Sequence, residues 1–193
     1  MRKLVVSMNL SLDGFLSGPK NGGLDWHFDC WSQEMGEKLL GQLDLADTIL
    51  LGKNSYDAMA GYWPVKTTDP NFPRQDLALA EKMNRYSKIV FTHSKAHPGW
   101  KNSIFTSTDP ETEIMRLKKL DGKNIILYGS GSLASFIAGT RLIDEYLLWI
   151  HPVILGSGKL LFENVRERVP LRLNDSAVFK SGVAALTYQA CYT

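Results

Sequence analysis

Short apolar runs alternate with segments of helical periodicity along most of this sequence, and this alternation constrains the fold more than any other feature. The apolar runs predict strands at residues 3–8, 48–51, 88–91, 103–105, 124–128 and 145–153. The periodic segments predict helices at residues 30–43, 55–60, 76–86, 110–120 and 132–139. Such alternation favours an α/β fold with a mostly parallel central sheet.

The C-terminal part departs from this alternation. Two apolar segments within residues 171–192 flank Lys180-Ser181-Gly182, which predicts an antiparallel hairpin at the edge of the sheet. Residues 13–25 and 61–75 are rich in turn-forming residues and are predicted to be loops. Because the sequence shows no internal repeat, linker or low-complexity run, we expect residues 1–193 to form one domain.

Charge and cysteine content argue against several classes of protein. The net charge is +2, from 22 Lys and Arg against 20 Asp and Glu, which is too small to indicate a nucleic-acid partner. No apolar run reaches membrane-spanning length, and the N-terminal residues predict a strand instead of a signal peptide. Cys30 and Cys191 lack zinc-ligand spacing and are expected to be free thiols in a reducing compartment. We therefore expect a cytoplasmic protein without a metal site.

Glycine-rich turns follow predicted strands, at the edge where open α/β sheets bind ligands. The strongest candidate is Gly129-Ser130-Gly131-Ser132, between a buried-type strand and a helix. Its glycines let the backbone approach a ligand closely, and a helix N-terminus offers free N–H groups to a pyrophosphate. A tight turn with a serine cap explains the motif equally well, and the full GxGxxG fingerprint is missing.

Two other strand ends carry polar or basic residues. The first is Gly52-Lys53-Asn54-Ser55, in which Asn54 is a plausible helix N-cap and Lys53 can pair with a phosphate. On its own, Lys53 is better explained as a solvated lysine. The second is Thr92-His93-Ser94-Lys95, whose hydroxyl and ammonium groups could clasp the 2′-phosphate of NADP. His93 alone is more typical of a surface loop.

Side chains that could contact a substrate are less clearly marked. Asp13 is a candidate catalytic carboxylate, although it also fits a simple turn. Asp29 is another, although carboxylates near helix N-termini usually interact with the helix dipole. Trp26 and Trp63 could line a flat aromatic pocket or pack in the core or a lid. For His151, at the end of a predicted strand, we expect a structural role.

Four motifs in a fixed order carry a family resemblance. They are Ser11-Leu12-Asp13-Gly14, Leu51-Gly52-Lys53-Asn54-Ser55-Tyr56, Tyr128-Gly129-Ser130-Gly131-Ser132-Leu133 and His151-Pro152-Val153-Ile154-Leu155-Gly156-Ser157-Gly158. In this order the chain resembles the bacterial dihydrofolate reductase-like family. Within it, the chain looks most like the group related to the C-terminal reductase domain of the bifunctional riboflavin-biosynthesis deaminase/reductase. Each motif is loose alone, whereas the ordered set is fairly specific and covers nearly the whole chain.

The resemblance implies a three-layer α/β/α fold of dihydrofolate reductase type, a homodimer, and NADPH-dependent hydride transfer to a pyrimidine- or pterin-like small molecule. The nearest implied activities are reduction of 5-amino-6-(5-phosphoribosylamino)uracil in riboflavin biosynthesis and reduction of dihydrofolate. The expected NADPH-binding residues are Gly52, Lys53, Asn54, Ser55, Thr92, His93, Ser94, Lys95, Tyr128, Gly129, Ser130, Gly131, Ser132 and Leu133. The expected substrate contacts are Asn9, Trp26, Tyr56 and Trp63, with Asp13 or Asp29 orienting the substrate or relaying a proton.

The substrate side departs from the family pattern. Trp31 stands where dihydrofolate reductases carry an acidic residue in the first long helix. Tyr128 stands where the riboflavin reductases commonly carry an acidic residue, and the zinc motif of the deaminase half is absent. The alternative function is therefore an NADPH- or flavin-binding module without reductase activity.

Overall fold

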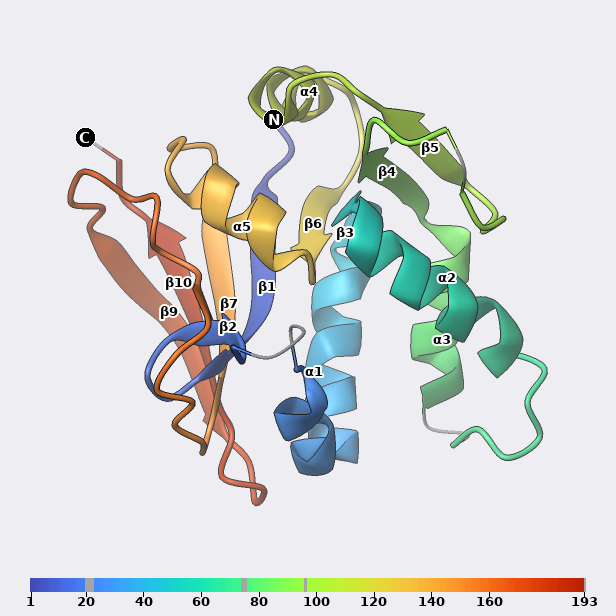
Figure 1. The fold of residues 1–193 in the computed structure, drawn as a ribbon, viewed down its shortest axis with the longest axis horizontal. Coiled ribbons are helices and arrows are strands. Elements are labelled where there is room, and N and C mark those ends of the chain that lie inside the picture. Colours follow the sequence, from blue (N-terminus) through green and yellow to red (C-terminus); the bar gives the residue numbers. More distant parts are fainter. Residues whose placement is uncertain (20–22, 74–75, 96, 193) are drawn as a thin grey trace.

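A mixed eight-stranded sheet forms the centre of the computed structural model, which describes residues 1–19, 23–73, 76–95 and 97–192 (Figure 1). The strand order is β5-β4-β3-β6-β1-β7-β10-β9. Their bounds are β1 (Leu4–Ser11), β3 (Ala46–Gly52), β4 (Ser87–Phe91), β5 (Ser103–Thr106), β6 (Asn124–Tyr128), β7 (Glu145–His151), β9 (Leu171–Val178) and β10 (Ala184–Ala190). In this spatial order, the strands from β5 across the sheet to β7 are parallel to one another, and β10 pairs antiparallel with both β7 and β9. The predicted parallel sheet and C-terminal hairpin are confirmed.

Helices cover both faces of this sheet. The helices are the 3₁₀ helix η1 (Asp25–Cys30), α1 (Gln33–Asp44), α2 (Lys53–Lys66), α3 (Leu77–Arg85), α4 (Pro110–Lys118) and α5 (Gly131–Ala138). The buried side chains of α1, α2 and α3 share one hydrophobic cluster with the sheet, and those of α4 and α5 share another. The fold is therefore the three-layer α/β/α arrangement of dihydrofolate reductase type that the resemblance implies.

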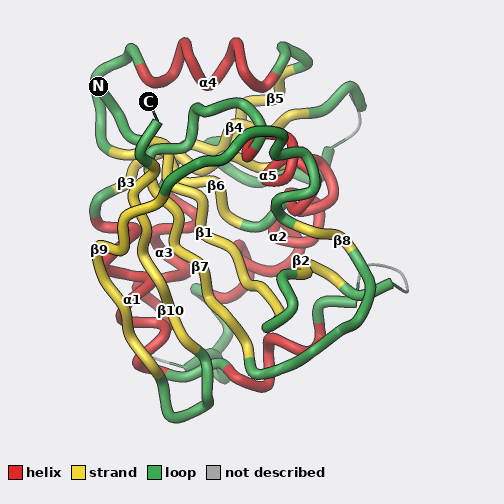
Figure 2. Tube along the Cα trace, turned by 90° about the vertical axis from the view of Figure 1, so that its left-hand side faces the viewer, coloured by secondary structure: helices red, strands yellow, loops and turns green. Residues whose placement is uncertain are grey.

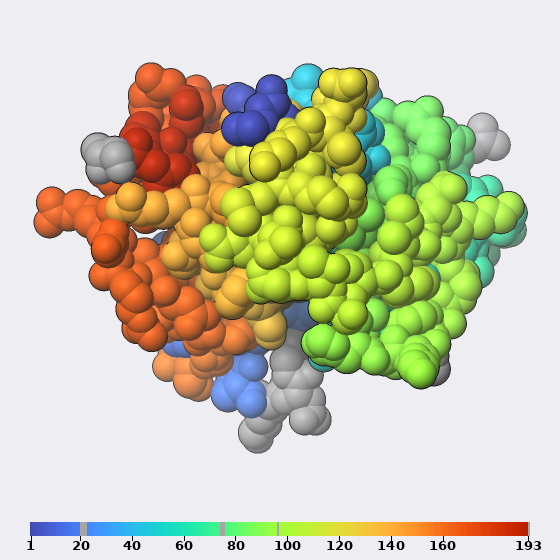
Figure 3. Space-filling model, turned by 90° about the horizontal axis from the view of Figure 1, so that it is seen from above, coloured from blue at the N-terminus to red at the C-terminus, as the bar shows by residue number. Residues whose placement is uncertain are grey.

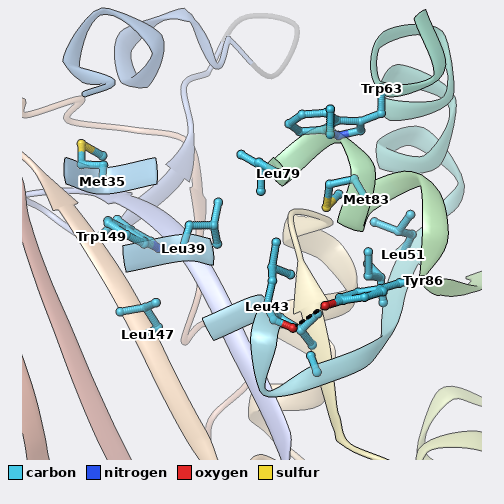
Figure 4. Close-up of a cluster of buried hydrophobic side chains, with 14 of the residues drawn as sticks. Met35, Leu39, Leu43, Leu51, Trp63, Leu79, Met83, Tyr86, Leu147 and Trp149 are labelled. Carbon is cyan, nitrogen blue, oxygen red and sulfur yellow. Dashed lines mark hydrogen bonds between the residues drawn. The ribbon is translucent and has the colours of Figure 1, made fainter. Parts of the chain in front are cut away.

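The alternation of side chains along the strands divides the core into these two clusters. Leu51 belongs to the cluster beneath α1–α3, whereas its neighbour Leu50 belongs to the cluster beneath α4 and α5. Helix α1 contributes Met35, Leu39 and Leu43, which are spaced by four residues and point toward the strands (Figure 4). Apolar residues on both faces explain why the parallel strands read as continuous hydrophobic runs.

A buried arginine closes the amino ends of the strands. Arg2 Nε donates to the carbonyl oxygen of Lys123 at 2.6 Å, and its guanidinium donates to Thr48 Oγ1 at 2.7 Å and pairs with Asp47. Seen from this side, the N-terminal residues lie against the segment that follows α4 (Figure 3). These contacts link the amino ends of β3 and β6.

Two helices, α1 and α2, differ from their predicted bounds by three or more residues at one end. Helix α2 continues through Pro64 to Lys66, into the predicted loop, because Trp63 packs into the core and holds the last turns. The helix predicted at 30–43 begins at Gln33, where the Ser32 hydroxyl accepts a hydrogen bond from the Met35 amide at 3.3 Å. Tertiary packing and capping, which local periodicity does not report, decide both differences.

One strand of a second, small sheet lies in a segment predicted to be a loop, residues 13–25. Strands β2 (Phe15–Ser17) and β8 (Lys159–Leu160) pair antiparallel and lie beyond the end of β1 (Figure 2). Three residues are too few to show an alternating pattern, and the partner strand is distant in sequence. Of the predicted loops, residues 20–22 and 74–75 lie outside the described residues.

Candidate active site

A crevice is expected where neighbouring strands lead to opposite faces of the sheet. Strand β6 leads into α5, which covers one face, whereas its neighbours β1 and β3 lead to α1 and α2 on the other face. The three strands are parallel, so their carboxyl ends meet at one edge. The turns after β3 and β6 are two of the three predicted phosphate sites, and they lie at this edge.

The turn after β6 leaves the start of α5 without a side-chain cap. Gly129 and Ser130 both have left-handed backbone conformations, with φ of 69° and 64°. Ser130 is the N-cap residue, but its hydroxyl accepts a hydrogen bond from the Gly52 amide at 2.5 Å instead of capping the helix. The first amides of a helix have no partner within it. The amides of Gly131, Ser132 and Leu133 are therefore available to an anion.

The turns after β3 and β6 touch each other, which the sequence did not reveal. A Cβ atom on Gly52 would lie 2.9 Å from Ser130 Oγ. A Cβ atom on Gly129 would lie 3.2 Å from Met59 Cε and 3.8 Å from Ser55 Oγ. Two predicted phosphate sites are thus parts of one glycine-lined turn pair, in which a side chain at Gly52 would clash with Ser130 and one at Gly129 would displace the flexible end of Met59.

Three other predicted cofactor residues in these turns have different environments from those expected. Asn54 is exposed and is not the N-cap of α2, because the chain already becomes helical after Gly52. Lys53 pairs with the carboxylate of Asp57 one turn later, so a phosphate would have to compete for its charge. The Leu133 side chain packs in the core, which leaves only its backbone amide for a ligand.

The third predicted site borders a separate cavity of about 420 Å³ at the ends of β4 and β5. Thr92 and His93 line it, together with Thr106 and Thr108. The Ser94 amide donates to Thr92 Oγ1 at 3.0 Å, and Ser94 and Lys95 are exposed beside the cavity. The cavity offers hydroxyl and imidazole groups at the same edge of the sheet as the turn pair, and the carboxylate of Asp109, which caps α4, also lines it.

Two predicted substrate contacts lie in the core instead. Tyr56 is fully buried; its hydroxyl donates to the Pro98 carbonyl at 2.7 Å and accepts from the Trp100 amide at 3.2 Å. Trp63 is also buried in the cluster beneath α1–α3 (Figure 4). Their apolar surfaces stabilise the packing of α2, so neither side chain is free to line a substrate pocket.

The carboxylate of Asp13, a predicted catalytic candidate, anchors a loop. Its carboxylate accepts hydrogen bonds from the Ser11 hydroxyl at 2.6 Å and from the amides of Leu155 and Gly156 at 3.1 and 2.8 Å. The bond from Ser11 contributes most to lowering the pKa of Asp13, and the two amides lower it further. Asp29, on η1, is exposed.

We expect Asp13→Ala to free the loop around Leu155 and Gly156. Because both amides lose their acceptor, their hydrogen exchange should accelerate by about tenfold. Asp13→Asn keeps one carboxamide oxygen as an acceptor and should show a smaller change. Exchange measured by mass spectrometry tests this. A loss of hydride-transfer rate in Asp13→Asn without faster exchange would restore Asp13 as a catalytic candidate.

Asn9 and Trp26 converge on a residue that the sequence analysis treated as structural. Asn9 Oδ1 lies 2.9 Å from His151 Nε2, and the Trp26 ring meets the His151 ring edge-on at 5.2 Å between centroids. Only 1 % of the His151 surface is exposed. Burial, helped by the charge of His27, lowers the pKa of His151 to about 4. His151 stands two residues after Trp149 on β7, so both side chains point to the face of the sheet that α1 covers. This spacing was the sequence signal that could have placed His151 there.

This low pKa predicts a loss of stability in acid. The unfolded chain binds the proton at the ordinary pKa of 6.5, whereas the folded protein binds it only near 4. Protonation between these values therefore favours unfolding, and His151 alone should lower the free energy of unfolding by about 3 kcal/mol between pH 7 and pH 4. Urea unfolding at both pH values tests this. His151→Gln should lack this contribution, and an equal loss in both proteins would contradict the prediction.

The part of the chain that the structure describes meets the requirements neither of metal sites nor of membrane-spanning helices. No group of three or more His, Cys, Asp or Glu residues there could hold a metal ion. None of the described helices is long and apolar enough to cross a membrane.

The comparison with known families decides the identity of this fold. The family model for the RibD C-terminal domain matches residues 2–185. The chain belongs to this family. It is 35% identical over 187 residues to the uncharacterized protein YyaP of Bacillus subtilis (strain 168), a match that covers 97% of this chain and 94% of YyaP.

Solved structures of RibD-like proteins share the fold. A putative riboflavin biosynthesis protein from Shewanella sp. PV-4 superposes with a TM-score of 0.73 at 20% identity, covering 98% of this chain and 99% of that one. The deaminase/5-amino-6-(5-phosphoribosylamino)uracil reductase of Thermotoga maritima gives a TM-score of 0.65 at 15% identity. This chain is covered to 98% in that match but corresponds to only 57% of the bifunctional protein.

Proposed function

We propose that this RibD C-terminal domain protein is a cytoplasmic NADPH-dependent reductase that transfers hydride to a pyrimidine- or pterin-like ring. The nearest activity is reduction of 5-amino-6-(5-phosphoribosylamino)uracil. The observation that carries the proposal is the bond between Ser130 Oγ and the Gly52 amide, which leaves the start of α5 open to an anion within the crevice. The family resemblance supports the same function.

The residues at the crevice fit a dinucleotide with an extra phosphate. The amides of Gly131 to Leu133 would hold the pyrophosphate, and Gly52 and Ser55 would border it. The cavity beside Thr92 and His93 would take the adenosine end, and the nearby exposed Lys95 would pair with a 2′-phosphate. When bound, NADPH supplies the hydride. Trp26 and Asn9 would orient the substrate, and the exposed Asp29 would relay a proton.

The proposal is tested by titrating the purified protein with NADPH and with NADH while following tryptophan fluorescence. We expect quenching at clearly lower concentrations of NADPH, because the cations and hydroxyls of the predicted 2′-phosphate site recognise an additional phosphate. Turnover with 5-amino-6-(5-phosphoribosylamino)uracil or dihydrofolate would establish the reductase. Failure to bind either nucleotide would refute the proposal.

A second candidate function is an NADPH- or flavin-binding module without reductase activity. It is favoured by the engagement of Asp13 with the loop at Leu155 and by Tyr128 in place of an acidic residue. Burial raises the pKa of Tyr128 to about 12, so its hydroxyl keeps its proton at neutral pH. Tight NADPH binding without turnover of any pyrimidine or pterin would select this alternative.

We also propose that the protein forms the homodimer that the resemblance implies. Strand β9 lies at the edge of the sheet and exposes apolar side chains, with 51% of Leu173 and 80% of Val178 accessible to solvent. An apolar edge strand invites pairing with a second chain. Light scattering coupled to gel filtration should give twice the mass of 21.6 kDa, and a monomer would contradict this.

A further inference from the structure

One ring nitrogen of His151 makes no hydrogen bond within the described part of the chain. Nδ1 is buried and has no hydrogen-bond partner among the described residues, whereas Nε2 faces Asn9 Oδ1 at 2.9 Å. A buried polar atom without a partner is costly, and such atoms in folded proteins call for an explanation. A ligand that completes the hydrogen bonding of Nδ1 would provide it.

The contact with Asn9 determines what this nitrogen can do. The carboxamide oxygen of Asn9 only accepts hydrogen bonds, so His151 Nε2 carries the proton in this arrangement. In a neutral imidazole the other nitrogen then has a lone pair. Nδ1 is therefore an acceptor, and its partner must be a donor, such as an N–H or O–H group.

His151 lies toward the same edge of the sheet as the crevice. It ends β7 and pairs in register with Ser11 at the end of β1, whereas β6 ends opposite Ser7 of the same strand. Its side chain lies on the same face of the sheet as Trp149, beneath η1. The rings of Trp26 and His27 on η1 lie 5.2 and 6.0 Å from the His151 ring.

The cover formed by η1 is suited to a flat ligand. None of its six residues is buried, and it rests on His151 through ring contacts. Phe28 on η1 and the following Trp31 are also exposed, at 68% and 41% of their surfaces. Of the exposed aromatic side chains, Phe28 contacts His27, which in turn contacts His151. Half-buried aromatic rings beside a buried acceptor favour an uncharged planar ring.

We propose that His151 is a substrate-binding residue whose Nδ1 accepts a hydrogen bond from a ring N–H group of an uncharged planar heterocycle. This inference rests on the proposed function, because it places the substrate ring in the crevice. Asn9 is a positioning residue that keeps the proton on Nε2. The pair thereby selects rings with N–H donors over rings whose nitrogens are alkylated.

The experiment compares two probes that differ in this donor. The affinities of 5,6-diaminouracil and of its 1,3-dimethyl derivative are measured by calorimetry, with and without NADP⁺. We expect the wild-type protein to prefer the unmethylated ring by about tenfold, the effect of one hydrogen bond. His151→Leu should abolish this preference, and His27→Leu, a matched change in the same ring cluster, should retain it.

A second measurement does not depend on a variant that folds. In the wild-type protein, the ¹⁵N chemical shift of His151 Nδ1 should move on addition of 5,6-diaminouracil.

The variant His151→Gln, which retains a side-chain acceptor, should keep part of the preference for the unmethylated ring. An unchanged Nδ1 signal, or the same preference in folded His151→Leu, would overturn the proposal.

The two proposals fail in different ways. If NADPH binds but neither pyrimidine does, the inference about His151 is wrong and the NADPH-dependent function stands. If the pyrimidine preference depends on His151 but no nicotinamide nucleotide binds, the inference stands and the reductase proposal is wrong.

Discussion

Replacing Gly129 by Asp should weaken NADPH binding by at least about 100-fold. Aspartate tolerates the left-handed conformation that Gly129 adopts, with φ of 69°, so the fold should persist. The new carboxylate would stand beside Ser55 and at the turn that opens α5. Like charges about 4 Å apart near a protein surface repel by about 4 kcal/mol, which exceeds the effect predicted here. Fluorescence titration at low ionic strength measures the loss.

The matched control is Gly129→Asn. Asparagine has the same shape and the same tolerance for this backbone conformation but carries no charge. Both substitutions push equally on Met59, whose flexible end lies 3.2 Å from the new Cβ position. We expect a loss of less than about fivefold for Asn, since only the charge is missing. Equal losses for Asp and Asn would show that space, and not charge repulsion, governs the turn.

The sequence predicted the strand–helix alternation and the glycine turns because both are local properties. A buried strand such as β6 reads as a continuous apolar run, and a glycine beyond it marks the turn. The contact between Ser130 and Gly52 could not be predicted in this way, because it joins residues 78 positions apart. The pairing of β2 with β8 could not be predicted for the same reason, because the two strands are far apart in the sequence.

The substrate side was harder to predict because its side chains are amphipathic. Tryptophan and tyrosine occur both in cores and in pockets, so composition alone could not place Tyr56 and Trp63 in the core. The same ambiguity hid His151, whose partner Asn9 comes from a strand that lies next to β7 only in the folded sheet. Register between β1 and β7 was the missing information.

Gly156 and Gly158, in the motif at residues 151–158, differ in how closely other atoms surround them. A Cβ atom on Gly158 would lie 1.9 Å from the backbone oxygen of Ser17, and its φ of 144° is strained for any other residue. We expect Gly158→Ala to lower the free energy of unfolding by about 4 kcal/mol, the sum of backbone strain and overpacking. Gly156 has φ of 73° but nothing within 4 Å, so Gly156→Ala should cost only about 1 kcal/mol.

The structural change caused by Gly158→Ala should also reach the crevice. Ser17 belongs to β2, and Leu16 of the same strand packs against the Cα side of Gly131 at the start of α5, 3.2 Å from where its Cβ would lie. Displacement of β2 by Gly158→Ala should therefore also weaken NADPH binding, whereas Gly156→Ala should leave it unchanged. Urea unfolding and fluorescence titration of both variants test this. If the two alanine variants were equally stable, the close packing of Gly158 against β2 would not be what requires glycine there.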